Sequence, residues 1–224
     1  MTERLPLFPL GMVLFPGLVL PLNVFEERYR ALVRDLLDGP QESRHFGVVA
    51  IREGREVGAD GITALHEIGC TARLQRAEAQ DDGRYELVTT GETRFRLTHL
   101  HTDDKPYFTG DVEWLGDDVG DADEAALLDR AVRTAFADYL AALSEAGGGQ
   151  VQAPDLPDDP LVLSHLVGAT ALLDLDERQA LLAEPDGAMR LRRELRLLKR
   201  EAVLLRVLRA APTSDYARVP ATPN

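Results

Sequence analysis

The sequence has a single cysteine and no long apolar run, and both shortages exclude classes of protein. Cys70 has no second cysteine to pair with, so the chain forms no internal disulfide, and a reducing compartment fits. Its position in an expected strand predicts a buried thiol rather than a nucleophile. A membrane-spanning helix needs roughly 20 apolar residues, and the start of the chain, with Glu3 beside Arg4, does not resemble an export signal. We therefore expect a cytoplasmic protein that does not enter a membrane.

Positive charge is also scarce, because 25 basic residues face 38 acidic ones and the net charge is -13. General binding to nucleic-acid phosphates rests on Lys and Arg, so this balance argues against it. The charge is unevenly placed: residues 116–189 contain sixteen Asp and Glu, whereas residues 190–209 contain eight Lys and Arg. We expect the basic segment to lie beside an acidic helical layer of the same molecule. A stripe that binds RNA or an acidic partner is the alternative.

The sequence lacks the residue patterns that are typical of catalytic and metal sites. A phosphate-binding loop needs a lysine after a glycine, and neither Lys105 nor Lys199 has one. His99 and His101 would share one face of a strand, but no third ligand follows at a suitable spacing. His165 lies in an apolar helical pattern and is expected to be a core histidine bonded to backbone. We therefore expect no enzymatic activity, no metal and no cofactor.

Short apolar segments separated by prolines and turn residues make up the first half of the chain. The prolines at positions 9, 16 and 21 confine residues 5–22 to sheet edges or corners, and Asn23 can cap a helix from Phe25 to Leu37. Asp81-Asp82-Gly83 predicts a hairpin turn. Further strands are expected at residues 46–52, 62–75, 85–88, 94–100 and 107–115, with a bend at Gly91. About six strands with one helix favour a small closed barrel, because closure hides strand edges.

After Gly116 the hydrophobic period becomes helical. Asp159-Pro160 places a capping residue before a proline at the first helical position, and the last helix has an apolar stripe wide enough to imply several neighbours. Helices are expected at residues 123–143, 160–173, 174–183 and 187–210. The prediction is an α+β protein with a β-rich barrel lobe at residues 1–116, a helical bundle lobe at residues 117–211 and a flexible tail at residues 212–224.

Four stretches of the chain, in order, resemble the amino-terminal domain of Lon proteases. They are the proline-interrupted opening at residues 5–29, the segments Gly69–Leu74 and Gly91–Arg96, and the run from Leu173 to Gln179 that leads to Leu181-Leu182. The resemblance implies a PUA-like pseudo-barrel joined to a helical bundle, and recognition of polypeptide substrates. The ATPase and peptidase domains of those proteases have no counterpart here, because the phosphate loop is absent and no residues remain for a Ser and Lys pair.

We therefore predict a non-enzymatic module that binds unfolded or exposed polypeptide segments, in protein quality control or as an adaptor. A separate protease is an expected partner, and weak self-association is expected too. Two alternatives remain: a PUA-like nucleic-acid-binding module that uses residues 190–209, and a small-molecule enzyme with a site between the lobes. The candidate binding residues are expected on the surface, at corners and at the start of the first helix, and they are Met12, Phe15, Pro16, Leu18, Val24, Phe25, Arg28 and Tyr29.

Overall fold

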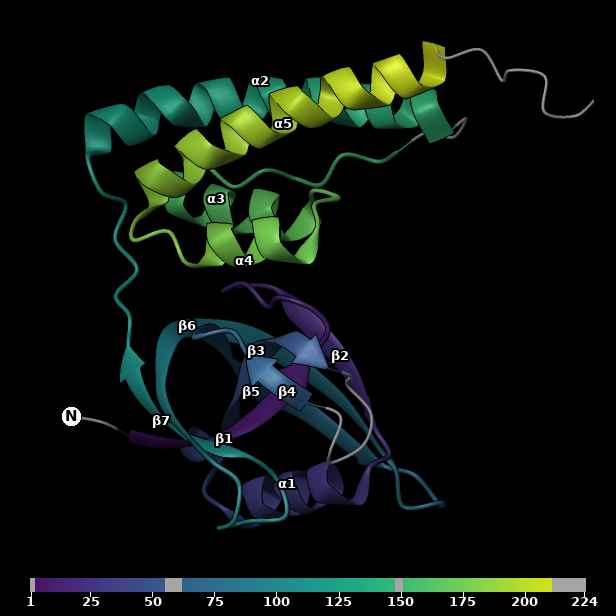
Figure 1. Ribbon diagram of the computed structural model, residues 1–224, viewed down its shortest axis with the longest axis vertical. Coiled ribbons are helices and arrows are strands. Elements are labelled where there is room, and N and C mark those ends of the chain that lie inside the picture. The colour runs from purple at the N-terminus through teal and green to yellow at the C-terminus, as the bar shows by residue number, and fades with distance from the viewer. Residues whose placement is uncertain (1–2, 55–61, 148–150, 211–224) are drawn as a thin grey trace, which may run out of the picture.

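The computed structural model describes residues 3–54, 62–147 and 151–210 and shows two lobes, one built on a sheet and one built of helices (Figure 1). The predicted α+β class is confirmed. The tail predicted at residues 212–224 lies outside the described residues.

Seven strands of the described chain form the first lobe. β1 pairs in parallel with β3 and antiparallel with β7, and the order β1-β7-β6-β5-β3 then returns to β1, which closes a barrel. β2 pairs with β6, and β4 pairs with β3. The closed barrel predicted from the sequence is therefore present. The strands are β1 (Glu3–Leu10), β2 (Val19–Val24), β3 (His45–Gly54), β4 (Ile62–Leu65), β5 (Ile68–Ala79), β6 (Tyr85–His101) and β7 (Thr109–Trp114).

The predicted hairpin at Asp81-Asp82-Gly83 is confirmed, since Gly83 has a φ of +80° and the Gln80 N–H donates to the Arg84 carbonyl at 2.8 Å. The two strands predicted on either side of Gly91 are one strand, β6, but its pairing with β5 shifts register between Gly91 and Arg94, so the predicted bend is present as a β-bulge. Glycine is also needed there because a Cβ on Gly91 would lie 2.2 Å from the Phe15 carbonyl oxygen. The single strand predicted at residues 62–75 is two strands, β4 and β5.

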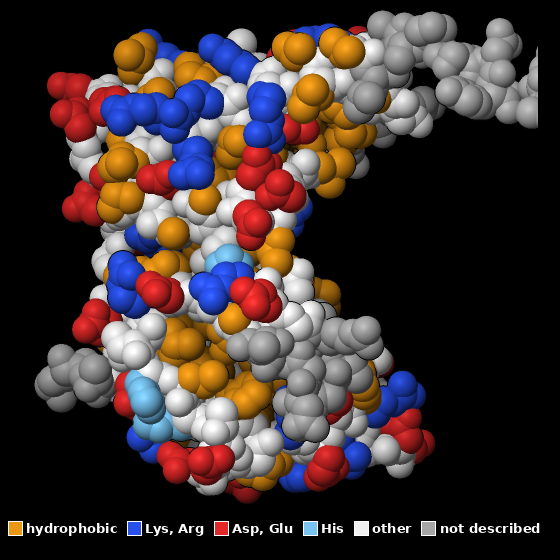
Figure 2. Space-filling model, in the orientation of Figure 1, with side chains coloured by type: hydrophobic (Ala, Val, Ile, Leu, Met, Phe, Trp, Pro, Cys, Tyr) orange, Lys and Arg blue, Asp and Glu red, His pale blue; other side chains and the backbone are white. Residues whose placement is uncertain are grey.

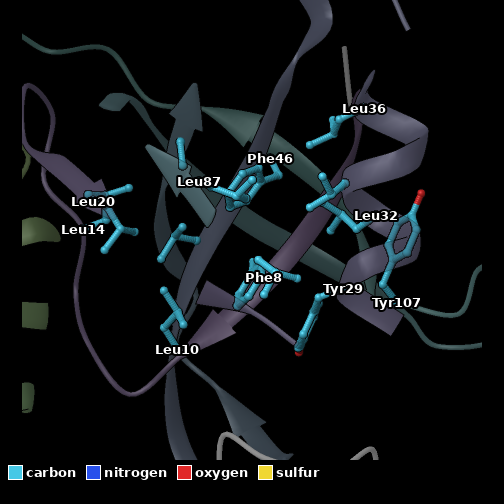
Figure 3. Close-up of a cluster of buried hydrophobic side chains, with 14 of the residues drawn as sticks. Phe8, Leu10, Leu14, Leu20, Tyr29, Leu32, Leu36, Phe46, Leu87 and Tyr107 are labelled. Carbon is cyan, nitrogen blue, oxygen red and sulfur yellow. The ribbon is translucent and has the colours of Figure 1, made fainter. Parts of the chain in front are cut away.

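One helix, α1 (Glu27–Asp38), packs on the barrel, and a short 3₁₀ helix follows at Gln41–Ser43. The predicted cap is wrong: Asn23 lies in β2 opposite Glu86, and no side chain caps α1. α1 buries its apolar face in the largest cluster of the lobe, where the Phe8 and Tyr29 rings stack with centroids 4.1 Å apart (Figure 3).

Four helices form the second lobe: α2 (Ala122–Gly147), α3 (Pro160–Thr170), α4 (Leu175–Leu182) and α5 (Gly187–Ala210). α2 and α5 lie side by side, and α3 and α4 lie between them and the barrel (Figure 1). The predicted cap of α3 is confirmed, because the Asp159 carboxylate accepts from the Leu161 N–H at 2.8 Å, with Pro160 following. The predicted stripe of α5 packs against α2 and α3 through Leu191, Leu195, Leu198, Ala202 and Leu205.

The basic residues of α5 face acidic neighbours, as the sequence predicts. Lys and Arg side chains lie next to Asp and Glu side chains on the visible face of the helical lobe (Figure 2). Much of the positive charge of the helix is therefore compensated within the lobe. The ion pairs join Arg192 to Glu124, Arg193 to Glu184, Arg200 to Glu177 and Arg206 to Asp138.

Candidate functional site

The candidate site is an apolar hollow between β1 and β2, with a volume of about 350 Å³, which we call the β1–β2 groove. β1 pairs with β7 only from Glu3 to Pro6, so its last residues have one ladder neighbour, β3. In the described chain, β2 has one ladder neighbour as well, β6. The groove thus lies where the edges of two strands are not joined. Its lining residues are Phe8, Leu10, Pro21, Leu22, Asn23, Val24, Phe25, Glu26 and Tyr29.

The prolines explain why the strands separate here. Pro9 lies in the half of β1 that has one neighbour, and Pro21 lies in β2. A proline has no N–H to donate, so strands that contain it are confined to edges. The prediction that the prolines lie in edge strands is therefore confirmed for Pro9 and Pro21. These edges border the β1–β2 groove, where β1 and β2 do not pair with each other.

A second hollow, of about 390 Å³, lies against β2 as well. It shares Pro21, Leu22 and Asn23 with the groove and is completed by β5 and β6 residues that include Arg76 and Glu86. β2 residues 21–23 therefore border both hollows.

The groove is bordered by a compact charged group at the start of α1. The Arg28 Nε donates to Glu26 Oε2 at 3.1 Å, and the Arg28 guanidinium lies 4.4 Å from the centre of the Tyr29 ring. This geometry is a cation–π contact. Phe25 projects beside it with 53% of its surface exposed. An apolar guest would thus meet an exposed aromatic ring at the rim and buried aromatic rings below.

The structure divides the eight predicted site residues into two groups. Val24, Phe25 and Tyr29 line the groove, and Arg28 lies on the Tyr29 ring. The other four belong to the connection between β1 and β2, at residues 11–18, which points toward the helical lobe (Figure 1). These four are Met12, Phe15, Pro16 and Leu18, of which Met12 is exposed and Leu18 half-buried.

Four of the predicted surface residues are buried, and the expectation that they are exposed is wrong. Phe15 and Pro16 are enclosed because their corner packs against the helical lobe, where Phe15 joins Ile68 and Leu181 in one cluster. Val24 and Tyr29 face the barrel core and present only an edge to the groove. Sequence reasoning missed Phe8, Leu10, Pro21 and Leu22 as groove residues, although the two strand prolines were the available signal.

The junction between the lobes is organised around Arg94, which lies on β6 and is buried. Its Nε donates to Asp117 Oδ1 at 2.8 Å, and its Nη1 donates to the carbonyl oxygens of Leu182 and Glu184 at 2.8 and 2.6 Å. Its Nη2 donates to the Gly116 carbonyl at 3.0 Å. One side chain of the barrel therefore holds the segment between α4 and α5 and the segment that leaves β7.

Three more ionisable groups are buried at this junction. Arg190 donates to the Leu181 carbonyl at 3.0 Å and to Ser164 Oγ at 2.9 Å, and burial lowers its pKa to about 10. Burial also raises the pKa of Glu194 well above its ordinary value, against the attraction of Arg190. The predicted core position of His165 is confirmed, but its partner is a carboxylate, since its Nε2 lies 3.2 Å from Asp117 Oδ2.

The remaining candidates do not form a catalytic or metal centre within the described residues. Cys70 is buried, and burial raises its pKa, as expected for a structural thiol. His66 lies 3.9 Å from Asp176 at a hollow between the lobes, but the Asp176 side chain is 88% exposed and no nucleophile accompanies the pair. His99 and His101 contact each other edge to face, and no group of three potential metal ligands occurs among the residues that the structure describes.

Comparison with known proteins identifies the family. The family model of the ATP-dependent protease La (LON) substrate-binding domain matches residues 4–200. The closed barrel joined to a helical lobe is therefore the fold of a Lon substrate-binding domain. The chain belongs to this family.

Curated proteins with a similar sequence include two bacterial Lon proteases, each much longer than this chain. The chain is 27% identical over 207 residues to Lon protease 2 of Myxococcus xanthus, which covers 92% of this chain and 24% of the relative. It is 27% identical over 205 residues to Lon protease of Anaeromyxobacter dehalogenans, covering 91% of this chain and 24% of the relative. The chain thus spans about a quarter of the length of the curated relatives it matches.

Solved structures give the same assignment. A Lon N-terminal domain protein from Xanthomonas campestris aligns with a TM-score of 0.58 at 26% identity, over 87% of this chain and 98% of that chain. The N-terminal domain of a Mycobacterium avium complex Lon protease, at 16% identity, shares the fold with a TM-score of 0.58, over 90% and 98% of the two chains. Among the described residues, no helix is long and apolar enough to span a membrane.

Proposed function

We propose that this chain binds exposed apolar segments of other polypeptides in the β1–β2 groove and performs no chemistry on them. The observation that carries the proposal is the seam between β1 and β2, which combines apolar lining with the edges of two strands. An extended segment can place alternate side chains in such a groove while its backbone lies along a strand edge. Membership of the substrate-binding family supports the same use.

The partner in this proposal is an unfolded or partly unfolded protein. Release of the captured segment to a separate ATP-dependent protease would make the chain an adaptor. Retention would make it a holdase. Neither form requires a catalytic group.

The test uses a fluorescein-labelled extended peptide of alternating Leu and Ser, followed by fluorescence anisotropy with the full chain. We expect Phe25→Ser and Leu22→Ser each to weaken binding about 10-fold, because about 1.4 kcal/mol of apolar contact is lost. Leu127→Ser is the matched control, since Leu127 on α2 is 69% exposed and far from the groove in the fold. Equal binding by Phe25→Ser, Leu22→Ser and the unaltered chain would contradict the proposal.

Salt distinguishes this function from the nucleic-acid alternative. Apolar capture should persist when the salt concentration rises, whereas binding of a single-stranded RNA oligonucleotide through residues 190–209 should weaken steeply. We expect the peptide signal to survive at high salt. Four of the eight basic residues at positions 190–209 form ion pairs with carboxylates, which reduces the positive charge available to phosphates.

A further inference from the structure

The connection between β1 and β2 joins the two walls of the groove. Leu10, the last residue of β1, lines one wall, and the connection at residues 11–18 leads to β2, which supplies Pro21–Val24 to the other. The spacing of the walls therefore depends on how this connection is held. Its tip, Phe15, is not held by the barrel alone.

Phe15 lies between two glycines, Gly91 of the barrel and Gly168 of the helical lobe. On the barrel side, a Cβ on Gly91 would lie 2.2 Å from the Phe15 carbonyl oxygen, and Gly17 N–H donates to the Gly91 carbonyl at 2.8 Å. On the helical side, a Cβ on Gly168 of α3 would lie 2.9 Å from Phe15 Cε1. The backbone of the connection is thus pressed to β6 while its aromatic ring sits on α3.

The Phe15 ring packs in a cluster that includes Ile68 of the barrel and several residues of the helical lobe, and we call the helical-lobe part of this cluster the Phe15 seat. The His165 ring lies with its centre 6.3 Å from that of Phe15, and Leu181 and Leu182 of α4 join the same apolar cluster. Glu194 of α5 approaches the same glycine, since a Cβ on Gly168 would lie 3.4 Å from Glu194 Oε1. α3, α4 and α5 therefore all contribute to one seat.

We propose that the Phe15 seat couples the helical lobe to the β1–β2 groove, so that the packing of α3 under Phe15 sets the order and spacing of the groove walls. The inference rests on the proposed function for its consequence in binding. The coupling itself can be measured without a ligand. Because packed interiors do not deform smoothly, a small displacement at the seat should be passed along the short connection rather than absorbed there.

The test is hydrogen exchange of the ligand-free full chain, combined with the Leu and Ser peptide assay. Gly168→Ala places a methyl group where the Phe15 ring lies and should displace it. Gly147→Ala is the matched control, because Gly147 also lies in a helix of this lobe and a Cβ there would meet no atom of another described segment within 4 Å. We expect exchange of those β2 amides that bond to β6 to be at least 10-fold faster in Gly168→Ala and unchanged in Gly147→Ala.

General destabilisation is separated from coupling by where exchange becomes faster. Coupling predicts faster exchange in β2 with little change in β3 and α2, whereas a general loss of stability would speed all of them. Phe15→Leu provides a second variant that removes the ring without adding bulk, and it should also loosen β2. Unchanged β2 exchange in both variants, or an equal increase throughout the chain in both, would overturn the proposal.

The peptide assay then separates the two proposals. If the unaltered chain binds the peptide and Gly168→Ala binds it at least 5-fold more weakly, the coupling reaches the groove. If Gly168→Ala loosens β2 but binds as tightly as the unaltered chain, the control of the groove is refuted. If no form of the chain binds the peptide, the proposed function fails, while the exchange result still decides the coupling.

Discussion

The interior of the β lobe and the junction between the lobes are both buried, but different kinds of side chain fill them. Leu32, Val33 and Phe46 of the β lobe lie in an apolar cluster. The junction buries Arg94 and Arg190, which donate to backbone carbonyls, and it buries Glu194 within the electrostatic reach of Arg190. Apolar packing is non-directional, whereas hydrogen bonds have preferred angles and lengths. We infer that the apolar interior supplies stability and that the polar junction fixes how the lobes are placed.

Removing Arg94 should have the largest effect on the polar junction. Arg94→Met leaves Asp117 and several carbonyl oxygens without their donor, and we expect the free energy of unfolding to fall by about 3–5 kcal/mol. Urea unfolding measures the change. Arg96→Met is the matched control on the same strand, because Arg96 forms an exposed ion pair with Glu67 and should cost at most about 1 kcal/mol. Similar losses for both variants would show that the junction does not depend on Arg94.

Glu194 of the junction should make the free energy of unfolding depend on pH, because its carboxyl is buried. Its pKa is raised by burial, so above its ordinary value of 4.5 the unfolded chain releases a proton that the folded chain retains. The free energy of unfolding should therefore fall as the pH rises above 4.5, by up to about 1.4 kcal/mol per pH unit until the folded pKa is reached. Below pH 4.5 Glu194 is protonated in both the folded and the unfolded chain, so this destabilisation is absent.

Glu194→Gln removes that titration and should gain stability relative to the unaltered chain as the pH increases. Thermal unfolding at pH 5 and pH 8 measures the difference between the two proteins at each pH. A difference that stays constant between these two pH values would contradict a buried, protonated Glu194.

The helix caps extend the comparison to a smaller effect. Asp159→Ala in the helical lobe removes a side chain that accepts from the first turn of α3, and we expect a loss of about 1 kcal/mol. Asn23→Ala in the β lobe should change stability by less than about 0.5 kcal/mol, since α1 has no side-chain cap. Both values come from urea unfolding. An Asn23→Ala loss as large as that of Asp159→Ala would restore the cap predicted from the sequence.

Local patterns predicted the elements, and long-range contacts decided what the sequence could not show. The turn at Asp81-Asp82-Gly83 and the cap at Asp159 depend on neighbouring residues, so both were predictable. The burial of Phe15 depends on Gly91 and Gly168, which lie far from it in the sequence. Nothing in the segment around Phe15 indicates that α3 will cover it, and an apolar residue at a proline corner is equally compatible with exposure.

The candidate site was predictable in part for the same reason. The region from Val24 to Tyr29 was found because the family resemblance and the start of a helix coincide there. The opposite wall, with Phe8 and Leu10, belongs to a segment whose prolines predicted an edge strand, but the sequence does not show which part of that strand is left with one neighbour. Only the ladder pairing shows that β1 changes from two neighbours to one partway along its length.

The closure of the barrel through β1 has a consequence for synthesis on the ribosome. β1 is made before the other strands of the barrel, yet the ladder that completes one of its edges requires β7, which ends at Trp114. Until that residue emerges, Leu5 and Leu7 cannot be enclosed by the finished barrel. Contacts between distant residues form slowly, so the nascent chain carries an uncovered apolar strand throughout translation of the first lobe.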